Sequence, residues 1–114
     1  MRIQTGNDFL LSASFVFHHT VLFSMNLHRK ILVLGRVQGV GFRDATWRKA
    51  MELGILGIVR NLDDGRVEIL ASAKSELMEQ FENWCRNGPP HARVDQIQIS
   101  ESSSVDFLEF RVEY

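Results

Sequence analysis

The chain has 114 residues, enough for one domain with one core but too few for separate catalytic and regulatory halves. Its 13 Lys and Arg against 14 Asp and Glu give a net charge of −1, so no overall basic field indicates nucleic-acid binding and any anion site must be local. The single cysteine, Cys85, excludes an internal disulfide and a cysteine cluster for zinc, and it favours the reducing cytoplasm.

Residues 1–24 differ in composition from the rest of the chain. The apolar run Phe9–Ser24 is interrupted by two histidines, and its length of about 16 residues is short of the roughly 20 that a membrane span needs. A signal peptide would have a cleaner apolar middle and a small-residue cleavage site. We therefore interpret residues 1–24 as an N-terminal extension and residues 25–114 as the domain, with Met25 as the intended start; an added strand and a targeting segment are the alternatives.

The first predicted elements are a strand over residues 29–38 and a helix over residues 42–53. Apolar residues of the strand alternate between two faces, and one face carries Ile31, Val33 and Val37. In the helix, the residues on one face recur at steps of three or four, namely Phe42, Thr46, Ala50 and Leu53. Gly54 stands where a C-terminal cap belongs, so the helix should end there.

Two further strands are predicted over residues 55–61 and 65–71. They are joined by the segment Leu62–Gly65, whose Asp-Gly pair is typical of a tight hairpin turn. The two strands should therefore be antiparallel neighbours. Asp63 and Asp64 are interpreted as turn residues and not as paired catalytic carboxylates.

A second helix is predicted over residues 74–88, where Pro89 and Pro90 prevent its continuation. Its apolar stripe forms part of the core and consists of Leu77, Phe81, Trp84 and Cys85. His91 follows in a surface loop. Two strands complete the chain, over residues 93–100 and 107–114, and the last one turns four side chains to one face: Leu108, Phe110, Val112 and Tyr114.

The order of elements is β-α-β-β-α-β with one extra C-terminal strand. This order predicts an α+β split β-α-β sandwich with both helices on one face of an antiparallel sheet. A right-handed crossover makes the first and second strands parallel, with the third between them. The loop Gln38–Gly41 and Asn61 should therefore lie at the same end of the sheet.

The loop after the first strand has the features of an anion site. Gly39 and Gly41 can turn successive N–H groups toward one point, and the start of the following helix adds free donors. Arg43 can add a planar guanidinium that matches two phosphate oxygens. A tight turn with a solvated Arg43 explains the spacing equally well. Arg60, next to Asn61, is interpreted as a solvated charge at the strand end, with a second positive charge for the site as the alternative.

Three segments carry a resemblance to a known family. "GRVQGVGFR", "LGILGIVRNLDDGRVEI" and "NGPPHARVD" resemble the characteristic segments of the acylphosphatase family, in the same order and at similar separations, over about residues 28–114. The resemblance implies a ferredoxin-like fold and a catalytic pair, Arg43 and Asn61. Two departures, Ala73 in place of a common Gly and Ile58 in place of a frequent Trp, lie outside the implied site and concern local packing.

The resemblance also implies the activity, hydrolysis of small acyl phosphates to a carboxylate and inorganic phosphate. It assigns the phosphoryl oxygens to the loop and the helix start: Gln38, Gly39, Val40, Gly41, Phe42 and Arg43. It assigns the attacking water to Asn61. Neither segment offers a side-chain base, so we expect the substrate phosphate to accept the proton of the water. We further expect a cytoplasmic monomer that acts on a small molecule without a cofactor, a metal, a membrane or a nucleic acid.

Two other functions fit the same order of elements. A non-enzymatic anion- or RNA-binding ferredoxin-like module is one, since split β-α-β folds host many functions. RNA recognition calls for exposed aromatic residues on the sheet and a basic stripe, and the sequence shows neither. The other keeps the site within a larger carbamoyl-phosphate machinery, which usually has a much longer chain with zinc-binding cysteines.

Overall fold

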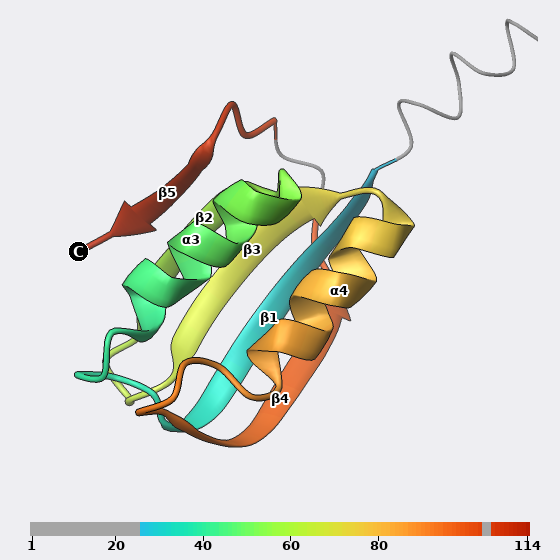
Figure 1. The fold of residues 1–114 in the computed structure, drawn as a ribbon. Coiled ribbons are helices and arrows are strands. Elements are labelled where there is room, and N and C mark those ends of the chain that lie inside the picture. The colour runs from blue at the N-terminus through green and yellow to red at the C-terminus, as the bar shows by residue number, and fades with distance from the viewer. Residues whose placement is uncertain (1–25, 104–105) are drawn as a thin grey trace, which may run out of the picture.

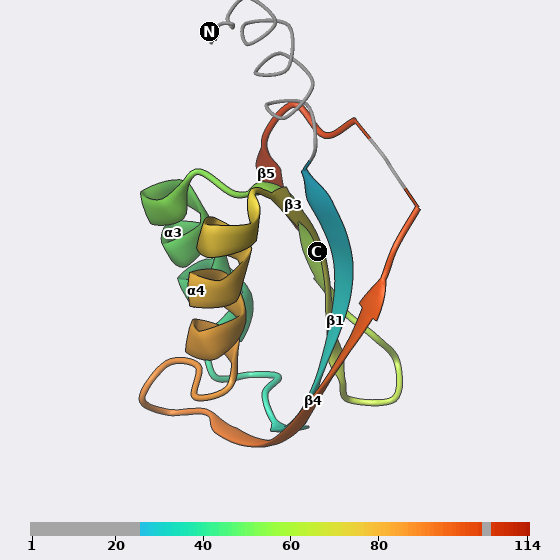
Figure 2. The same cartoon turned by 90° about the vertical axis from the view of Figure 1, so that its right-hand side faces the viewer.

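The fold is a five-stranded sheet with two helices on one face (Figures 1 and 2). The computed structural model describes residues 26–103 and 106–114, so the interpretation of residues 1–24 lies outside the described residues. The elements in chain order are β1 (Leu27–Arg36), α3 (Phe42–Leu53), β2 (Leu56–Asn61), β3 (Val67–Ala73), α4 (Ser75–Cys85), β4 (Arg93–Glu101) and β5 (Phe110–Glu113).

The strand order is β4-β1-β3-β2-β5, which confirms the predicted ferredoxin-like sandwich. β1 pairs antiparallel with both β3 and β4, and β3 pairs antiparallel with β2. β1 and β2 therefore run parallel, with β3 between them, as expected from the crossover through α3. Their C-terminal ends meet at one edge of the sheet.

The C-terminal strand β5 pairs parallel with β2, so the whole sheet is mixed and only its first four strands are antiparallel. The reason lies in where β4 ends. Its last residue, Glu101, is level with Arg29 near the start of β1, and Phe110 at the start of β5 is level with Gly57 near the start of β2. β5 therefore begins at the same end of the sheet as β4 ends, and it runs in the direction of β2.

The core lies between the sheet and the two helices and confirms most of the predicted faces. It is made of the inward residues of β1 to β3, of the inner faces of α3 and α4, and of one residue of β5; its largest fully buried side chains are Phe42, Phe81, Ile31, Ile55, Ile69, Met78, Val33, Val37, Val59 and Val67. Thr46 is also buried, and its hydroxyl donates to the carbonyl of Phe42 at 2.8 Å, so this buried hydroxyl has a hydrogen-bond partner.

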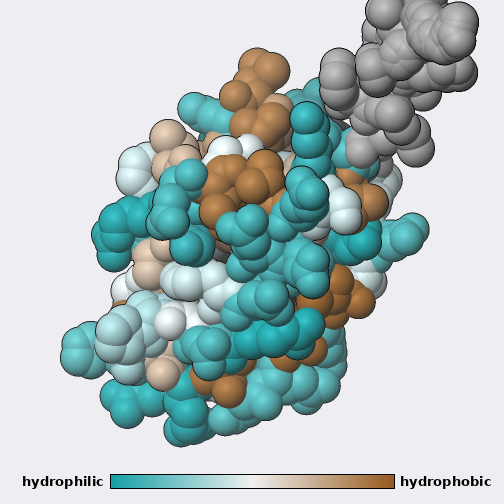
Figure 3. All heavy atoms as spheres, turned by 45° about the vertical axis from the view of Figure 1, so that its right-hand side comes forward, coloured by the Kyte–Doolittle hydropathy of each residue, from teal (hydrophilic) through white to brown (hydrophobic). Residues whose placement is uncertain are grey.

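Three details of the predicted faces differ. In α4, Met78 is buried while Leu77 is half-buried, because the buried stripe is wide enough to include neighbouring positions. Leu108, predicted to face inward, is 94% exposed, since β5 begins only at Phe110. Tyr114 lies after β5 and is 85% exposed. On the face shown in Figure 3, hydrophobic atoms form small separate groups among hydrophilic ones.

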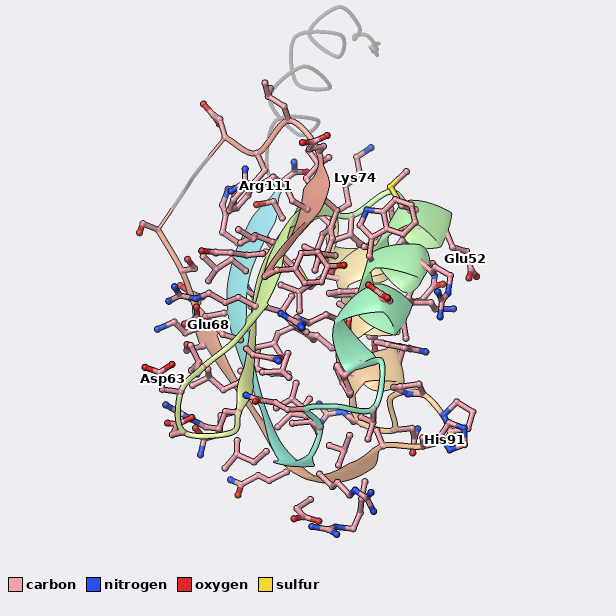
Figure 4. All side chains as sticks on the ribbon, turned by 90° about the vertical axis from the view of Figure 1, so that its left-hand side faces the viewer. Glu52, Asp63, Glu68, Lys74, His91 and Arg111 are labelled. Carbon is pink, nitrogen blue, oxygen red and sulfur yellow. The ribbon has the colours of Figure 1, made fainter. Side chains whose placement is uncertain are left out.

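The sheet face without helices holds a group of paired charges. Arg60 Nε donates to Glu68 Oε1 at 2.7 Å, and Lys30 Nζ lies 3.8 Å from Glu68 Oε2. Figure 4 shows Glu68 on the side of the sheet away from the helices. Because alternate residues of a strand face opposite sides, Arg60 points away from Asn61. Arg60 does not line the cavity and is paired with Glu68, which favours the interpretation of Arg60 as a charge at the strand end.

The turn between β2 and β3 has the predicted form. The backbone N–H of Arg66 donates to Asp64 Oδ1 at 3.1 Å, and Arg66 Nε donates to Asp64 Oδ2 at 2.9 Å. These hydrogen bonds hold the pKa of Asp64 below its usual value. Asp63 is exposed at the tip of the turn, and His91 is exposed in the loop before β4 (Figure 4). Both aspartates are thus turn residues, as predicted.

Candidate active site

A cavity of about 100 Å³ opens at the sheet end where β1 and β2 finish and α3 begins. Its lining residues come from the loop after β1, from α3, from the end of β2 and from the segment after β5: Val37, Gly39, Gly41, Phe42, Arg43, Asp44, Asn61 and Tyr114. The predicted convergence of the glycine loop with Asn61 is therefore observed. Gln38 and Val40 do not line the cavity; Val40 packs against the core.

The loop depends on glycine for its backbone shape. Gly39 has φ 74° and Gly41 has φ 78°, both in the left-handed region that side chains disfavour. A Cβ atom on either residue would meet nothing within 4 Å, so conformation and not space requires glycine here. Gly41 is the N-cap of α3 and gives no side-chain hydrogen bond to the helix. The amides at the helix start lack partners within the helix and bring partial positive charge to the cavity.

Gln38 holds the loop against the hairpin. Its side-chain Nε2 donates to the carbonyl of Leu62 at 2.8 Å and to the carbonyl of Arg66 at 2.9 Å. Leu62 follows Asn61 directly, so these two hydrogen bonds fix the position of the loop relative to Asn61. No local pattern of residues predicts this cross-link, because it joins Gln38 to residues 24 and 28 positions away.

Arg43 reaches the cavity from the first turn of α3. Its Nη1 donates to the carbonyl of Glu113 at 3.1 Å, and its Cζ lies 4.7 Å from the centre of the Tyr114 ring, a cation–π contact. These contacts restrict the guanidinium from one side. A guanidinium has five N–H donors, so others are available for an anion in the cavity.

Asn61 ends β2 and faces the cavity. Its Oδ1 atom is buried and has no hydrogen-bond partner among the described residues. A buried oxygen without a partner costs about 1–3 kcal/mol of stability, so natural proteins rarely retain one without a reason. A small polar molecule in the cavity would supply the missing donor.

Three residues that line the cavity lie outside the predicted site: Val37, which was assigned to the core face of the first strand, and two polar residues, Asp44 and Tyr114. Asp44 follows Arg43 in α3 and is exposed, and Tyr114 was assigned to the core face of the last strand. The hydroxyl of Tyr114 donates to Asp44 Oδ1 at 3.0 Å. This hydrogen bond raises the pKa of Tyr114. The position of Tyr114 depends on the parallel pairing of β5 with β2, and no local pattern of residues predicts this pairing.

Other chemistries find little support in the described part of the chain. Within residues 26–103 and 106–114 no group of three or more His, Cys, Asp and Glu side chains is placed to hold a metal ion. Cys85 is buried in the core, which raises the pKa of its thiol and disfavours the thiolate nucleophile. Neither α3 nor α4 is long and apolar enough to cross a membrane.

Comparison with known proteins gives one consistent result. The family model of acylphosphatase matches residues 29–112. An acylphosphatase of Methylococcus capsulatus is 49% identical over 83 residues, which are 72% of this chain and 90% of that protein. The structure of an acylphosphatase from Coxiella burnetii has a TM-score of 0.76 at 34% identity and covers 80% of this chain and 96% of that chain. The crystal structure of acylphosphatase from Bacillus subtilis has a TM-score of 0.74 at 40% identity, and the match covers 79% of this chain and 100% of that chain.

Proposed function

The chain belongs to the acylphosphatase family, and from this membership we propose how its cavity works. The protein is an acylphosphatase, a hydrolase that cleaves the carboxyl–phosphate bond of small acyl phosphates. In our assignment the phosphoryl group sits in the loop between β1 and α3, held by Arg43 and by the backbone amides from Gln38 to Phe42. Asn61 orients the water that attacks it.

The reaction needs charge stabilisation and a placed water more than a strong acid or a covalent nucleophile. The water oxygen bonds to phosphorus, the bond from phosphorus to the acyl oxygen breaks, and the carboxylate leaves with the electron pair. Arg43 and the amides stabilise negative charge on the phosphoryl oxygens as this happens. The proton of the water passes to a phosphoryl oxygen of the substrate. Positioning and charge stabilisation of this kind account for large rate accelerations.

The observation that carries the assignment is the unpaired Oδ1 of Asn61 in the same cavity as Arg43. A carboxamide oxygen accepts a hydrogen bond from water, while a guanidinium donates to phosphate oxygens. The two groups therefore offer the two reactants complementary partners. Gly39 and Gly41 add amide donors at the helix start, where an anion is favoured.

The remaining features of the proposal concern the domain and its partners. We assign residues 25–114 to the catalytic domain and residues 1–24 to an extension that catalysis does not need. A cytoplasmic monomer without a nucleic-acid partner stays our prediction. For the nucleic-acid part of this prediction, the support is that the residues turned to the helix-free side of β1 to β5 include no Phe, Tyr or Trp for stacking on bases.

The direct test is hydrolysis of benzoyl phosphate by the purified full chain, with and without EDTA. We expect turnover well above the spontaneous rate and no effect of the chelator. Absence of hydrolysis by protein whose circular dichroism shows a folded domain would contradict the proposal and favour a binding module. Loss of activity with EDTA would contradict the metal-free mechanism.

A further inference from the structure

The rim of the cavity is formed by a contact between two exposed residues that lie 70 positions apart, Asp44 and Tyr114. The Tyr114 hydroxyl donates to Asp44 Oδ1 at 3.0 Å, while the ring of Tyr114 covers Arg43. Tyr114 thus lies between a carboxylate at its hydroxyl end and a guanidinium at its face. The hydrogen bond fixes the carboxylate at the mouth of the cavity.

The size of the cavity determines which part of a substrate meets this rim. At about 100 Å³ it is well below the roughly 300 Å³ at which pockets for ordinary ligands begin. It suits a phosphoryl group and leaves no space for an acyl group as well. The acyl group of a bound acyl phosphate must therefore extend through the mouth, past Asp44 and Tyr114.

The charges at the mouth are unequal once phosphate is bound. Among the side chains of the described lining residues, Arg43 is the only cation and Asp44 the only carboxylate. The phosphoryl group compensates the charge of Arg43, whereas Asp44 keeps its own. A charge at the mouth acts on groups within a Debye length, about 8–10 Å at physiological salt, and an acyl group at the rim falls within this range.

We propose that Asp44, held by the Tyr114 hydroxyl, selects substrates by the charge of the acyl group. Neutral and cationic acyl groups are favoured, and acyl groups that carry a carboxylate of their own are disfavoured. This inference rests on the proposed function. Asp44 is a specificity-determining residue in it and takes no part in the bond changes.

Three probes that share the benzoyl phosphate frame and differ in the charge of the para group test the inference: benzoyl phosphate, 4-carboxybenzoyl phosphate and 4-(trimethylammonio)benzoyl phosphate. Values of kcat/KM are divided by the spontaneous hydrolysis rate of each probe, which removes differences in intrinsic reactivity. The wild type should prefer the cationic probe over the anionic one. Asp44→Asn removes the charge but keeps an oxygen that accepts the Tyr114 hydrogen bond, and it should reduce this preference about three- to tenfold.

The matched control is Glu76→Gln, which removes a carboxylate from the first turn of the other helix, α4. It should leave the preference unchanged. A second measurement needs no variant, since rising ionic strength should bring the rates of the two charged probes together for the wild type. Unchanged preference in Asp44→Asn, or a preference that salt does not alter, would overturn the inference while benzoyl phosphate is still hydrolysed. Failure of the folded wild type to hydrolyse benzoyl phosphate would overturn the proposed function itself.

Discussion

The side-chain amide of Gln38 lies 2.8 Å from the carbonyl oxygen of Leu62 and donates a hydrogen bond to it. This contact joins the loop after β1 to the turn after β2, the two segments that meet at the cavity. The loop carries the proposed phosphate donors and the end of β2 carries Asn61. The hydrogen bonds of Gln38 therefore help to set the distance between the proposed phosphate donors and Asn61.

Gln38→Ala should loosen the site and also reduce stability. It removes two neutral hydrogen bonds, each contributing about 0.5–1.5 kcal/mol, so the free energy of unfolding in urea should fall by about 1–3 kcal/mol. Misplacement of the loop by a fraction of an ångström should lower kcat/KM for benzoyl phosphate by about tenfold or more. Gln98→Ala, on the exposed side of β4, is the control and should alter neither quantity. Full activity in Gln38→Ala would show that the loop keeps its position without the cross-link.

Arg43→Ala should weaken both turnover and phosphate binding, because the guanidinium contacts the phosphoryl group before and during the reaction. Loss of a charge-assisted hydrogen bond should raise the inhibition constant of inorganic phosphate about tenfold or more. Arg43→Lys keeps the charge without the planar fork and should restore little of either property. Arg48→Ala, an exposed arginine of the same helix, serves as the control. Near-normal kinetics of Arg43→Lys would contradict the forked contact.

Asn61→Ala should lower kcat by about 100-fold or more and leave the inhibition constant of inorganic phosphate unchanged. The reason is that Asn61 is proposed to hold the water and not the phosphoryl group. Steady-state kinetics with phosphate as the inhibitor separate the two effects. Asn83→Ala, exposed in α4, is the matched control. If Asn61→Ala loses phosphate inhibition and remains folded, the residue shapes the phosphate site and another group must orient the water.

A protein that begins at Met25 should fold and keep the kcat/KM of the full chain. β1 begins at Leu27, and every residue that lines the cavity follows it. Thermal unfolding and benzoyl phosphate hydrolysis, measured on both lengths of chain, provide the comparison. Insolubility or loss of activity in the shorter protein would show that residues 9–24 complete the sheet or its core.

The central part of the fold could be predicted because it follows from local patterns and one general rule. Alternation identified β1, β2 and β3, helical spacing identified α3, and the handedness of crossovers brought the loop to Asn61. The position of β5 could not be predicted in this way. Its parallel pairing with β2 depends on where β4 ends, which no local pattern indicates. The contact of Tyr114 with Arg43 and Asp44 depends on this pairing and could not be predicted either.

The cation–π contact between Arg43 and Tyr114 also has a consequence for how the protein acquires activity. This contact and the two hydrogen bonds beside it, which join residues 70 positions apart, form slowly, because a long loop must close before they stabilise the chain. β5 is a strand of four residues at one edge of the sheet, and such edges open most easily in the native state. In refolding, the burial of Phe42 and Phe81 should therefore precede the return of full activity, and hydrogen exchange should be faster at β5 than at β1 or β3.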